Sequence, residues 1–301
     1  MLPQLDFSTV DITQVRAGLA AMRGGAPVVD VPGVVTEIIT VPGPQGAPDV
    51  RVVVHRPVEA VGAIPAILHI HGGGYVIGEA NVGDVASRAI VKALRCAVYS
   101  VDYRLAPETV HPGPVEDCYA ALAYIAGNAV ALGVDAARIG VMGESAGGGL
   151  AAGLALLARD RGGPKLAFQH LIYPMIDDRT GVSGEPHPHT GEFVWRARDN
   201  RFGWGALLGC APGGDGVSAY AAAARAEDLS GLPPAFIAVG TLDLFVEEDV
   251  EYARRLMRAG VPVELHVYPG AYHGFQLAGT ARVTLAANRD SLEALRRAMF
   301  G

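Results

Sequence analysis

The sequence predicts an α/β protein built on a mostly parallel, twisted sheet flanked by helices. From residue 64 onward, short apolar runs typical of buried strands alternate with longer segments of helical character. Half of the 301 residues are hydrophobic and only 18% are charged, which suits a compact chain with a sizeable core. Because strands joined by helices run parallel, we expect one sheet with helices on both faces.

Eight segments have the length and apolar content of strands. The first two, Val35–Val41 and Val50–Arg56, alternate in polarity and flank a Pro/Gly-rich turn at 42–48, so they should form an antiparallel hairpin at a sheet edge. The other six are Ile64–Ile70, Ala97–Asp102, Arg138–Met142, Ala167–Tyr173, Ala235–Gly240 and Val263–Tyr268.

Helical segments separate and follow these strands. They cover roughly Ile12–Met22, Asp84–Arg95, Val115–Leu132, Ala146–Arg161, Glu247–Ala259 and Thr284–Met299. Residues 177–228 break the alternation, because they contain no clear strand and carry both tryptophans. We therefore expect a helical cap from residues 1–34 plus about 177–228, with Ala219–Ala226 as one of its helices. The catalytic domain would then comprise about 35–176 and 229–301.

Charge and cysteine content exclude several classes of protein. The net charge is −7 and no Lys/Arg block occurs, which disfavours nucleic-acid and anionic-membrane partners. The N-terminal segment lacks the basic-then-apolar pattern of a signal peptide. Cys96, Cys118 and Cys210 are widely spaced and form no C-x-x-C, so we expect a cytoplasmic protein in which they pack as small apolar groups.

The segment Gly143-Glu144-Ser145-Ala146-Gly147 follows a predicted strand and opens a predicted helix. G-x-S-x-G in this setting is typical of a nucleophile elbow. The two flanking glycines leave room for a sharp turn that lifts the serine hydroxyl above the sheet, at the positive end of the helix. A glycine-rich helix start with an N-cap serine is the alternative, but the flanking strand and helix favour the elbow.

A nucleophilic serine needs a base, and the base needs an orienting acid. In enzymes with this elbow the chain order is Ser, then Asp or Glu, then His, each after a strand. Asp243 and His273 each follow a predicted strand, so we expect both at the same end of the sheet as Ser145. Glu247 and Glu248 are rivals to Asp243, but they lie in the next helix, where they should face solvent or cap its N-terminus.

Three consecutive glycines, Gly72 to Gly74, follow His71 at the end of an apolar strand. A phosphate loop would read G-x-x-x-x-G-K-[ST] or G-x-G-x-x-G, and neither is present. Acyl transfer instead requires backbone N–H groups aimed at a developing oxyanion, which an H-G-G-G loop supplies. Gly73, Gly74 and Ala146 are therefore the predicted oxyanion hole.

Three motifs together resemble those of the bacterial hormone-sensitive-lipase-like esterases, family IV of the bacterial lipolytic enzymes. They are HGGG at 71–74, DYRLAPE at 102–108 and GESAGG at 143–148, within a similarity that spans about residues 35–298. The resemblance implies an α/β-hydrolase fold with a cap, and hydrolysis of short- to medium-chain acyl esters without a cofactor. It implies Ser145, Asp243 and His273 as the catalytic triad, and structural roles for His71 and Arg104.

Two departures from the family pattern leave substrate preference open. Glu144 stands in the elbow where Asp or Thr is more usual, and no proline follows Asp243. An amidase, deacetylase or lactonase with the same triad is an alternative. A non-catalytic ligand-binding protein of this fold is another, which the presence of His273 disfavours. The resemblance also suggests a homodimer through Val263–Tyr268 and its flanking helix.

Aromatic and histidine residues in and near the insertion allow two further hypotheses. Six aromatic residues either line a substrate pocket or pack the cap: Tyr75, Phe193, Trp195, Phe202, Trp204 and Phe275. His187 and His189 suggest a metal, but no Cys or carboxylate stands at ligand spacing, so we expect no metal site.

Overall fold

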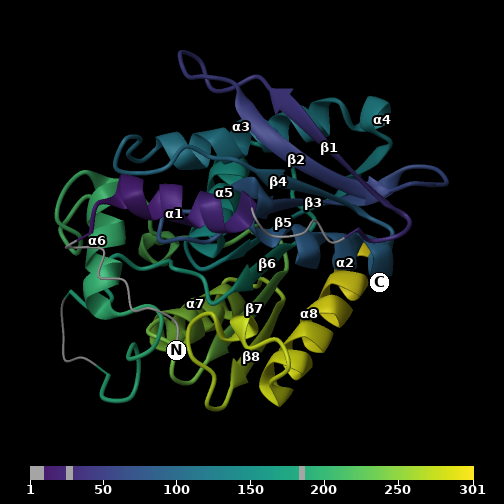
Figure 1. The fold of residues 1–301 in the computed structure, drawn as a ribbon. Coiled ribbons are helices and arrows are strands. Elements are labelled where there is room, and N and C mark those ends of the chain that lie inside the picture. Colours follow the sequence, from purple (N-terminus) through teal and green to yellow (C-terminus); the bar gives the residue numbers. More distant parts are fainter. Residues whose placement is uncertain (1–9, 25–29, 183–186) are drawn as a thin grey trace.

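A single mixed sheet forms the centre of the structure (Figure 1). The computed structural model describes residues 10–24, 30–182 and 187–301. Within these residues the strand order is β1-β2-β4-β3-β5-β6-β7-β8. The strands are β1 Val34–Val41, β2 Val50–Pro57, β3 Ile64–Ile70, β4 Ala97–Val101, β5 Val134–Glu144, β6 Gln169–Ile172, β7 Ala235–Gly240 and β8 Val263–Tyr268.

Of the strands in the described residues, only β2 runs opposite to the other seven. It pairs antiparallel with β1 and β4, whereas the pairs from β4 through β8 are all parallel. The predicted edge hairpin and mostly parallel sheet are therefore confirmed. Because parallel strands present their carboxyl ends at one edge, the loops after β3, β5, β7 and β8 meet there.

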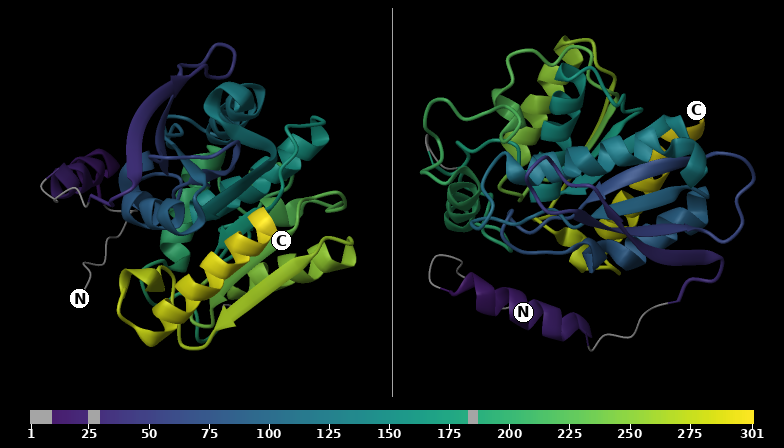
Figure 2. Two further views of the ribbon diagram at one scale, coloured as in Figure 1. Left: turned by 90° about the vertical axis from the view of Figure 1, so that its right-hand side faces the viewer. Right: turned by 90° about the horizontal axis from the view of Figure 1, so that it is seen from above.

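Helices cover both faces of the sheet (Figures 1 and 2). Their bounds are α1 Ile12–Gly24, α2 Asp84–Leu94, α3 Gly113–Gly127, α4 Ala129–Leu132, α5 Ala146–Asp160, α6 Ala197–Leu208, α7 Val246–Arg258 and α8 Arg282–Phe300. One face packs α2 and α8 through Leu94 and Leu295 against Ile67 and Met142. The other face packs α3, α5 and α7, and α5 is buried from Ala146 to Ala158.

Three helix predictions differ from the structure. The segment Val115–Leu132 divides into α3 and α4 at Asn128, whose side-chain amide donates to the Tyr124 carbonyl and whose ψ of 14° leaves the helix. Within the described part of 177–228, α6 is the one α-helix. The segment Ala219–Ala226 forms only a 3₁₀ turn, Ala223–Arg225, because the Arg255 guanidinium bonds the Ala224 and Ala226 carbonyls.

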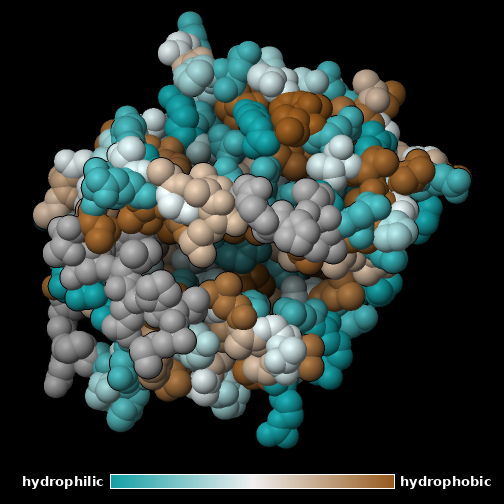
Figure 3. Space-filling view, in the orientation of Figure 1, coloured by the Kyte–Doolittle hydropathy of each residue, from teal (hydrophilic) through white to brown (hydrophobic). Residues whose placement is uncertain are grey.

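The first described helix is attached to the loops at the carboxyl edge of the sheet. Arg16 of α1 donates to the carbonyls of Val76 and Ala106, each at 2.7 Å, and pairs with Glu108. The space-filling view shows a recess in the surface directly below α1 (Figure 3). None of the described helices is both long and apolar enough to cross a membrane.

Candidate active site

Ser145 lies at the sharp turn between β5 and α5. Its φ of 55° and ψ of −122° are unusual for a residue other than glycine, so the surrounding structure must hold this backbone in place. A Cβ atom on Gly143 would come within 2.2 Å of the Gly147 carbonyl oxygen, and one on Gly147 within 2.0 Å of the Ile70 carbonyl oxygen. The turn therefore requires glycine on both sides of the serine.

Ser145, His273 and Asp243 form a hydrogen-bonded chain. The Ser145 hydroxyl lies 2.9 Å from His273 Nε2, and His273 Nδ1 lies 2.9 Å from Asp243 Oδ2 and 3.1 Å from Oδ1. With Nδ1–H donating to the carboxylate, Nε2 is left to accept the serine proton. The sequence places the serine and histidine 128 positions apart, and the fold brings them into contact.

The three side chains of this chain are shielded from solvent. Asp243 is fully buried, and His273 and Ser145 are 5% and 8% exposed. The Phe245 N–H donates to Asp243 Oδ1 at 3.0 Å, which holds the carboxylate in place. Tyr173 and Phe245 present ring edges to His273, with centroids at 4.7 and 5.1 Å. These contacts restrict the imidazole to one orientation.

The glycines after β3 form the wall next to the serine. A Cβ on Gly72 would lie 3.3 Å from the Ser145 Cβ, and one on Gly73 would lie 2.0 Å from the Ile77 carbonyl oxygen. Gly73 and Gly74 have φ values of 126° and 59°, which favour glycine. Among the described residues, no carbonyl accepts from the N–H groups of Gly73, Gly74 or Ala146. All three can donate to a substrate oxygen.

Polar residues behind the glycine loop fix its position. His71 Nδ1 donates to the Gly72 carbonyl at 2.8 Å, and burial lowers the pKa of His71 to about 4, so the ring is neutral. Tyr103 stacks on this ring at 4.3 Å and donates to the His71 carbonyl. Arg104 makes a two-pronged ion pair with the fully buried Asp117. His71 therefore supports the loop from behind, and Arg104 ties the turn after β4 to α3.

The six candidate aromatic residues divide into two groups. Trp195 packs its indole on Gly74, where an added Cβ would meet the ring at 2.2 Å, and lies 6.4 Å from His273. Phe193 is 44% exposed and lies 5.8 Å from Tyr272. The other four pack into the interior: Tyr75, Trp204 and Phe275 are buried, and Phe202 is half-buried against the core.

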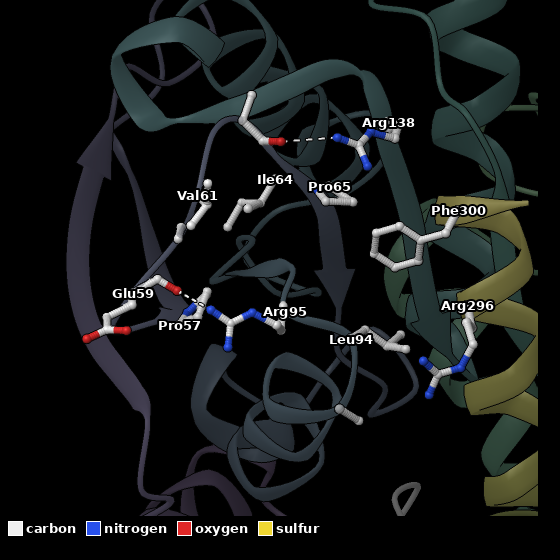
Figure 4. A pocket seen from close by; sticks show the side chains of 13 residues that line it. Pro57, Glu59, Val61, Ile64, Pro65, Leu94, Arg95, Arg138, Arg296 and Phe300 are labelled. Carbon is white, nitrogen blue, oxygen red and sulfur yellow. Dashed lines mark hydrogen bonds between the residues drawn. The ribbon is translucent and has the colours of Figure 1, made fainter.

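A cavity of about 480 Å³ lies away from these residues (Figure 4). It is lined by residues at the amino ends of β3 and β5, including Ile64 and Arg138, together with Phe300 at the end of α8. None of the predicted site residues borders it. His187 and His189 lie with ring centroids 6.1 Å apart, and the described residues contain no group of three possible metal ligands.

Two polar contacts near the site were missed by sequence reasoning. Glu248 is buried, and its Oε1 accepts from the Ile176 and Asp177 N–H groups where the insertion leaves the sheet, so it does not face solvent as expected. Glu144 pairs with His69, whose Nε2 lies 2.9 Å from Glu144 Oε2. The unusual Glu144 was a visible signal, but nothing in the sequence identified its partner.

Comparisons with known proteins agree with this geometry. The family described as the α/β-hydrolase fold matches residues 67–277. Carboxylesterase NlhH of Mycobacterium tuberculosis is 36% identical over 263 residues, which is 85% of this chain and 81% of that protein. An arylesterase of Saccharolobus solfataricus is 34% identical over 209 residues, covering 69% and 67% of the two chains.

Solved structures of esterases have the same fold as this chain. A bacterial heroin esterase superposes with a TM-score of 0.94 at 42% identity, covering 100% of this chain and 95% of the other. The hyperthermophilic esterase of the archaeon Pyrobaculum calidifontis superposes with a TM-score of 0.82 at 32% identity, covering 96% and 92%. These likenesses extend over the sheet, its helices and the insertion.

Proposed function

Because the chain belongs to the α/β-hydrolase fold family and is a carboxylic ester hydrolase within it, we propose that Ser145, His273 and Asp243 hydrolyse short- to medium-chain acyl esters. The observation that carries the proposal is the unbroken chain of hydrogen bonds from the serine hydroxyl to the buried carboxylate. Such a chain needs no cofactor, since the nucleophile and the acid–base group are both protein side chains.

The reaction proceeds through an acyl-enzyme. His273 Nε2 takes the Ser145 proton as the oxygen attacks the ester carbonyl, and the imidazolium formed is stabilised by Asp243. The carbonyl oxygen gains charge next to the N–H groups of Gly73, Gly74 and Ala146. His273 returns the proton to the leaving alcohol, and a water activated by the same imidazole releases the acid.

The position of Trp195 supports a preference for short acyl groups. Its indole covers Gly74 on one side and approaches His273 on the other, so it bounds the space where the substrate carbonyl must lie. Its Nε1–H donates to Asn200 Oδ1 at 3.1 Å, which fixes the ring. We propose that the described parts of 1–34 and 177–228 form the cap; residues 1–9, 25–29 and 183–186 lie outside the described residues.

The proposal is tested with p-nitrophenyl esters from acetate to palmitate. The wild type should hydrolyse the short esters fastest, and Ser145→Ala should lose at least about 10³-fold in kcat. Ser230→Ala, which changes an exposed serine beside Arg159 at the far end of α5, is the matched control. Equal activity of Ser145→Ala and wild type would refute the nucleophile. A folded wild type that cleaves amides or lactones but no ester would favour those alternatives.

Removing the Trp195 indole should lengthen the preferred acyl chain. Trp195→Ala is expected to move the maximum of kcat/KM by about two to four carbons, because the wall beside Gly74 is lost. Phe193→Ala is the control, since Phe193 is largely exposed and contacts Tyr272 instead. If Trp195→Ala and Phe193→Ala keep the wild-type chain-length profile, the indole does not set the preference.

We also propose a cytoplasmic location and a homodimer, with small-molecule esters as substrates and no nucleic-acid partner. Two of the free cysteines, Cys96 and Cys118, are buried, which supports a reducing location; Cys210 is exposed and does not pack as expected. Among the described strands β8 is the last in the sheet, so one of its backbone edges is left without a neighbouring strand and could pair with a second copy. Sedimentation equilibrium at micromolar concentration tests the dimer.

A further inference from the structure

The inference concerns the pair formed by His69 and Glu144, directly behind the nucleophile. Glu144 is the last residue of β5 and precedes Ser145, and His69 stands two residues before the oxyanion loop. The two strands pair with His69 opposite Met142, so the side chains of His69 and Glu144 lie on the same face of the sheet. His69 Nε2 lies 2.9 Å from Glu144 Oε2.

His69 is enclosed by polar groups from several elements. Its side chain is 3% exposed, against 28% for Glu144. On β4, Ser100 Oγ lies 3.1 Å from His69 Nδ1. A serine hydroxyl can donate to a neutral imidazole or accept from a charged one, so this contact survives in both protonation states. Asp84, on α2, is a second carboxylate that acts on the ring, and His71 is a neighbouring histidine.

The charge on Glu144 has a consequence for catalysis. The Glu144 carbonyl oxygen would lie 2.9 Å from a Cβ on Gly72, so the residue that carries this carboxylate borders the oxyanion loop. An unpaired carboxylate on the residue next to the nucleophile repels the negative charge that develops in the transition state. A protonated His69 compensates that charge.

We propose that His69 and Glu144 form a charge-compensating ion pair directly behind the nucleophile, and that its loss at alkaline pH lowers kcat. The proposal rests on the proposed function, since it concerns the same active site. Burial disfavours the charged form of His69, but the attraction and hydrogen bond of Glu144 and the attraction of Asp84 together outweigh it, and the pKa of His69 is raised above 6.5. The ion pair therefore exists below this raised pKa, where His69 is protonated. It is lost as the pH rises through that pKa and His69 releases its proton.

Three variants separate charge compensation from a purely structural role. His69→Gln removes the group that can compensate the Glu144 charge, so kcat should fall about tenfold near pH 7 and the alkaline decline should vanish. Glu144→Gln removes the charge, so kcat should stay within about threefold of wild type near pH 7 and remain flat up to pH 9. The double variant, which pairs two neutral amides, should recover most of the activity that His69→Gln loses.

The measurement is kcat and KM for p-nitrophenyl acetate from pH 6 to 9.5, corrected for spontaneous hydrolysis. An alkaline decline of the same size in wild type and Glu144→Gln would overturn the proposal, as would a double variant weaker than His69→Gln. A wild type inactive on all esters would instead refute the proposed function.

A second readout does not depend on turnover. ¹⁵N NMR of the His69 ring in Ser145→Ala should show an imidazolium at pH 6.5 that titrates at a higher pH. Adding Glu144→Gln should lower that midpoint. A ring that is neutral at pH 6.5 in the presence of Glu144 would overturn the ion pair.

Discussion

At the scale of single residues, the candidate active site depends on glycines, whose lack of a Cβ atom lets two backbone segments pack closely. Gly147 shows this directly, because a Cβ there would lie 2.0 Å from the Ile70 carbonyl oxygen and 2.5 Å from the His71 carbonyl oxygen. The backbone that leads into the oxyanion loop therefore packs against the turn that carries the nucleophile. Neither segment can move without the other.

Gly147→Ala should consequently lose both stability and activity. Relief of the clash requires a shift of the backbone at residues 70 and 71, which costs about 1–3 kcal/mol in the free energy of unfolding and displaces the oxyanion donors. Gly214→Ala is a matched control, since no heavy atom lies within 4 Å of its added Cβ. Urea unfolding and kcat measure the effect. A Gly147→Ala protein as stable and active as the control would contradict the packing argument.

Some residues of the candidate site can be predicted from the sequence, and others cannot. Ser145, Asp243 and His273 can be predicted as a triad because their motifs combine with strand ends, and the parallel sheet brings these three side chains into contact. His69 lies 75 positions from Glu144, and no local pattern links them. Trp195 and Trp204 look equivalent in the sequence, yet one lies at the site and the other is fully buried against Tyr75. Packing alone distinguishes them.

At the scale of elements, the strands were predicted well and the insertion poorly. A short apolar run indicates a buried strand. The eight predicted runs all overlap observed strands. The insertion has no such signal. Its alanine-rich segment has high helix propensity, but carbonyl contacts from Arg255 on α7 hold Ala224 and Ala226 in a tighter turn. A tertiary contact overrides local preference there.

The attachment of α1 leads to a prediction at this scale. Arg16→Ala removes the bonds to the Val76 and Ala106 carbonyls, so α1 should loosen from the loop that follows the oxyanion glycines. We expect KM for a short ester to rise about three- to tenfold with little change in kcat.

Glu108→Gln is the control for that variant. It weakens the exposed ion pair with Arg16 but leaves both carbonyl bonds in place, and exposed pairs contribute little. Its KM should stay within about twofold of wild type. Identical KM values for Arg16→Ala and Glu108→Gln would show that α1 does not act on the site through these bonds.

At the scale of the whole molecule, two buried histidines contribute to the loss of stability in acid. Burial lowers the pKa of His170 to about 3 and that of His71 to about 4, whereas the unfolded chain protonates histidine near pH 6.5. The unfolded state therefore binds more protons between those values. The stability that these groups contribute is present above pH 6.5 and is lost as the pH falls.

A His170 variant tests this response. His170 stacks on Phe236 at 4.2 Å and shares a 2.8 Å hydrogen bond with Ser291. His170→Phe keeps the stacking and removes the titrating group, so its loss of stability between pH 7 and 4.5 should be smaller than that of wild type by about 2–3 kcal/mol. Ser291→Ala keeps the imidazole and should retain the wild-type slope. Chemical denaturation at both pH values gives the free energy of unfolding of each protein. An equal decrease of this free energy from pH 7 to 4.5 in wild type and His170→Phe would exclude His170 as a source of acid sensitivity.

The distribution of the three reacting side chains along the chain has a kinetic consequence. Ser145 meets His273 across 128 positions, and Asp243 meets His273 across 30. Contacts of such long range close late, since the entropy of joining distant segments is lost before the contacts stabilise the chain. A refolding population should therefore regain helical circular dichroism before it regains hydrolysis. Turnover recovers only when β5, β7 and β8 have reached their final register. The rate of its recovery therefore measures the rate of the last step of folding.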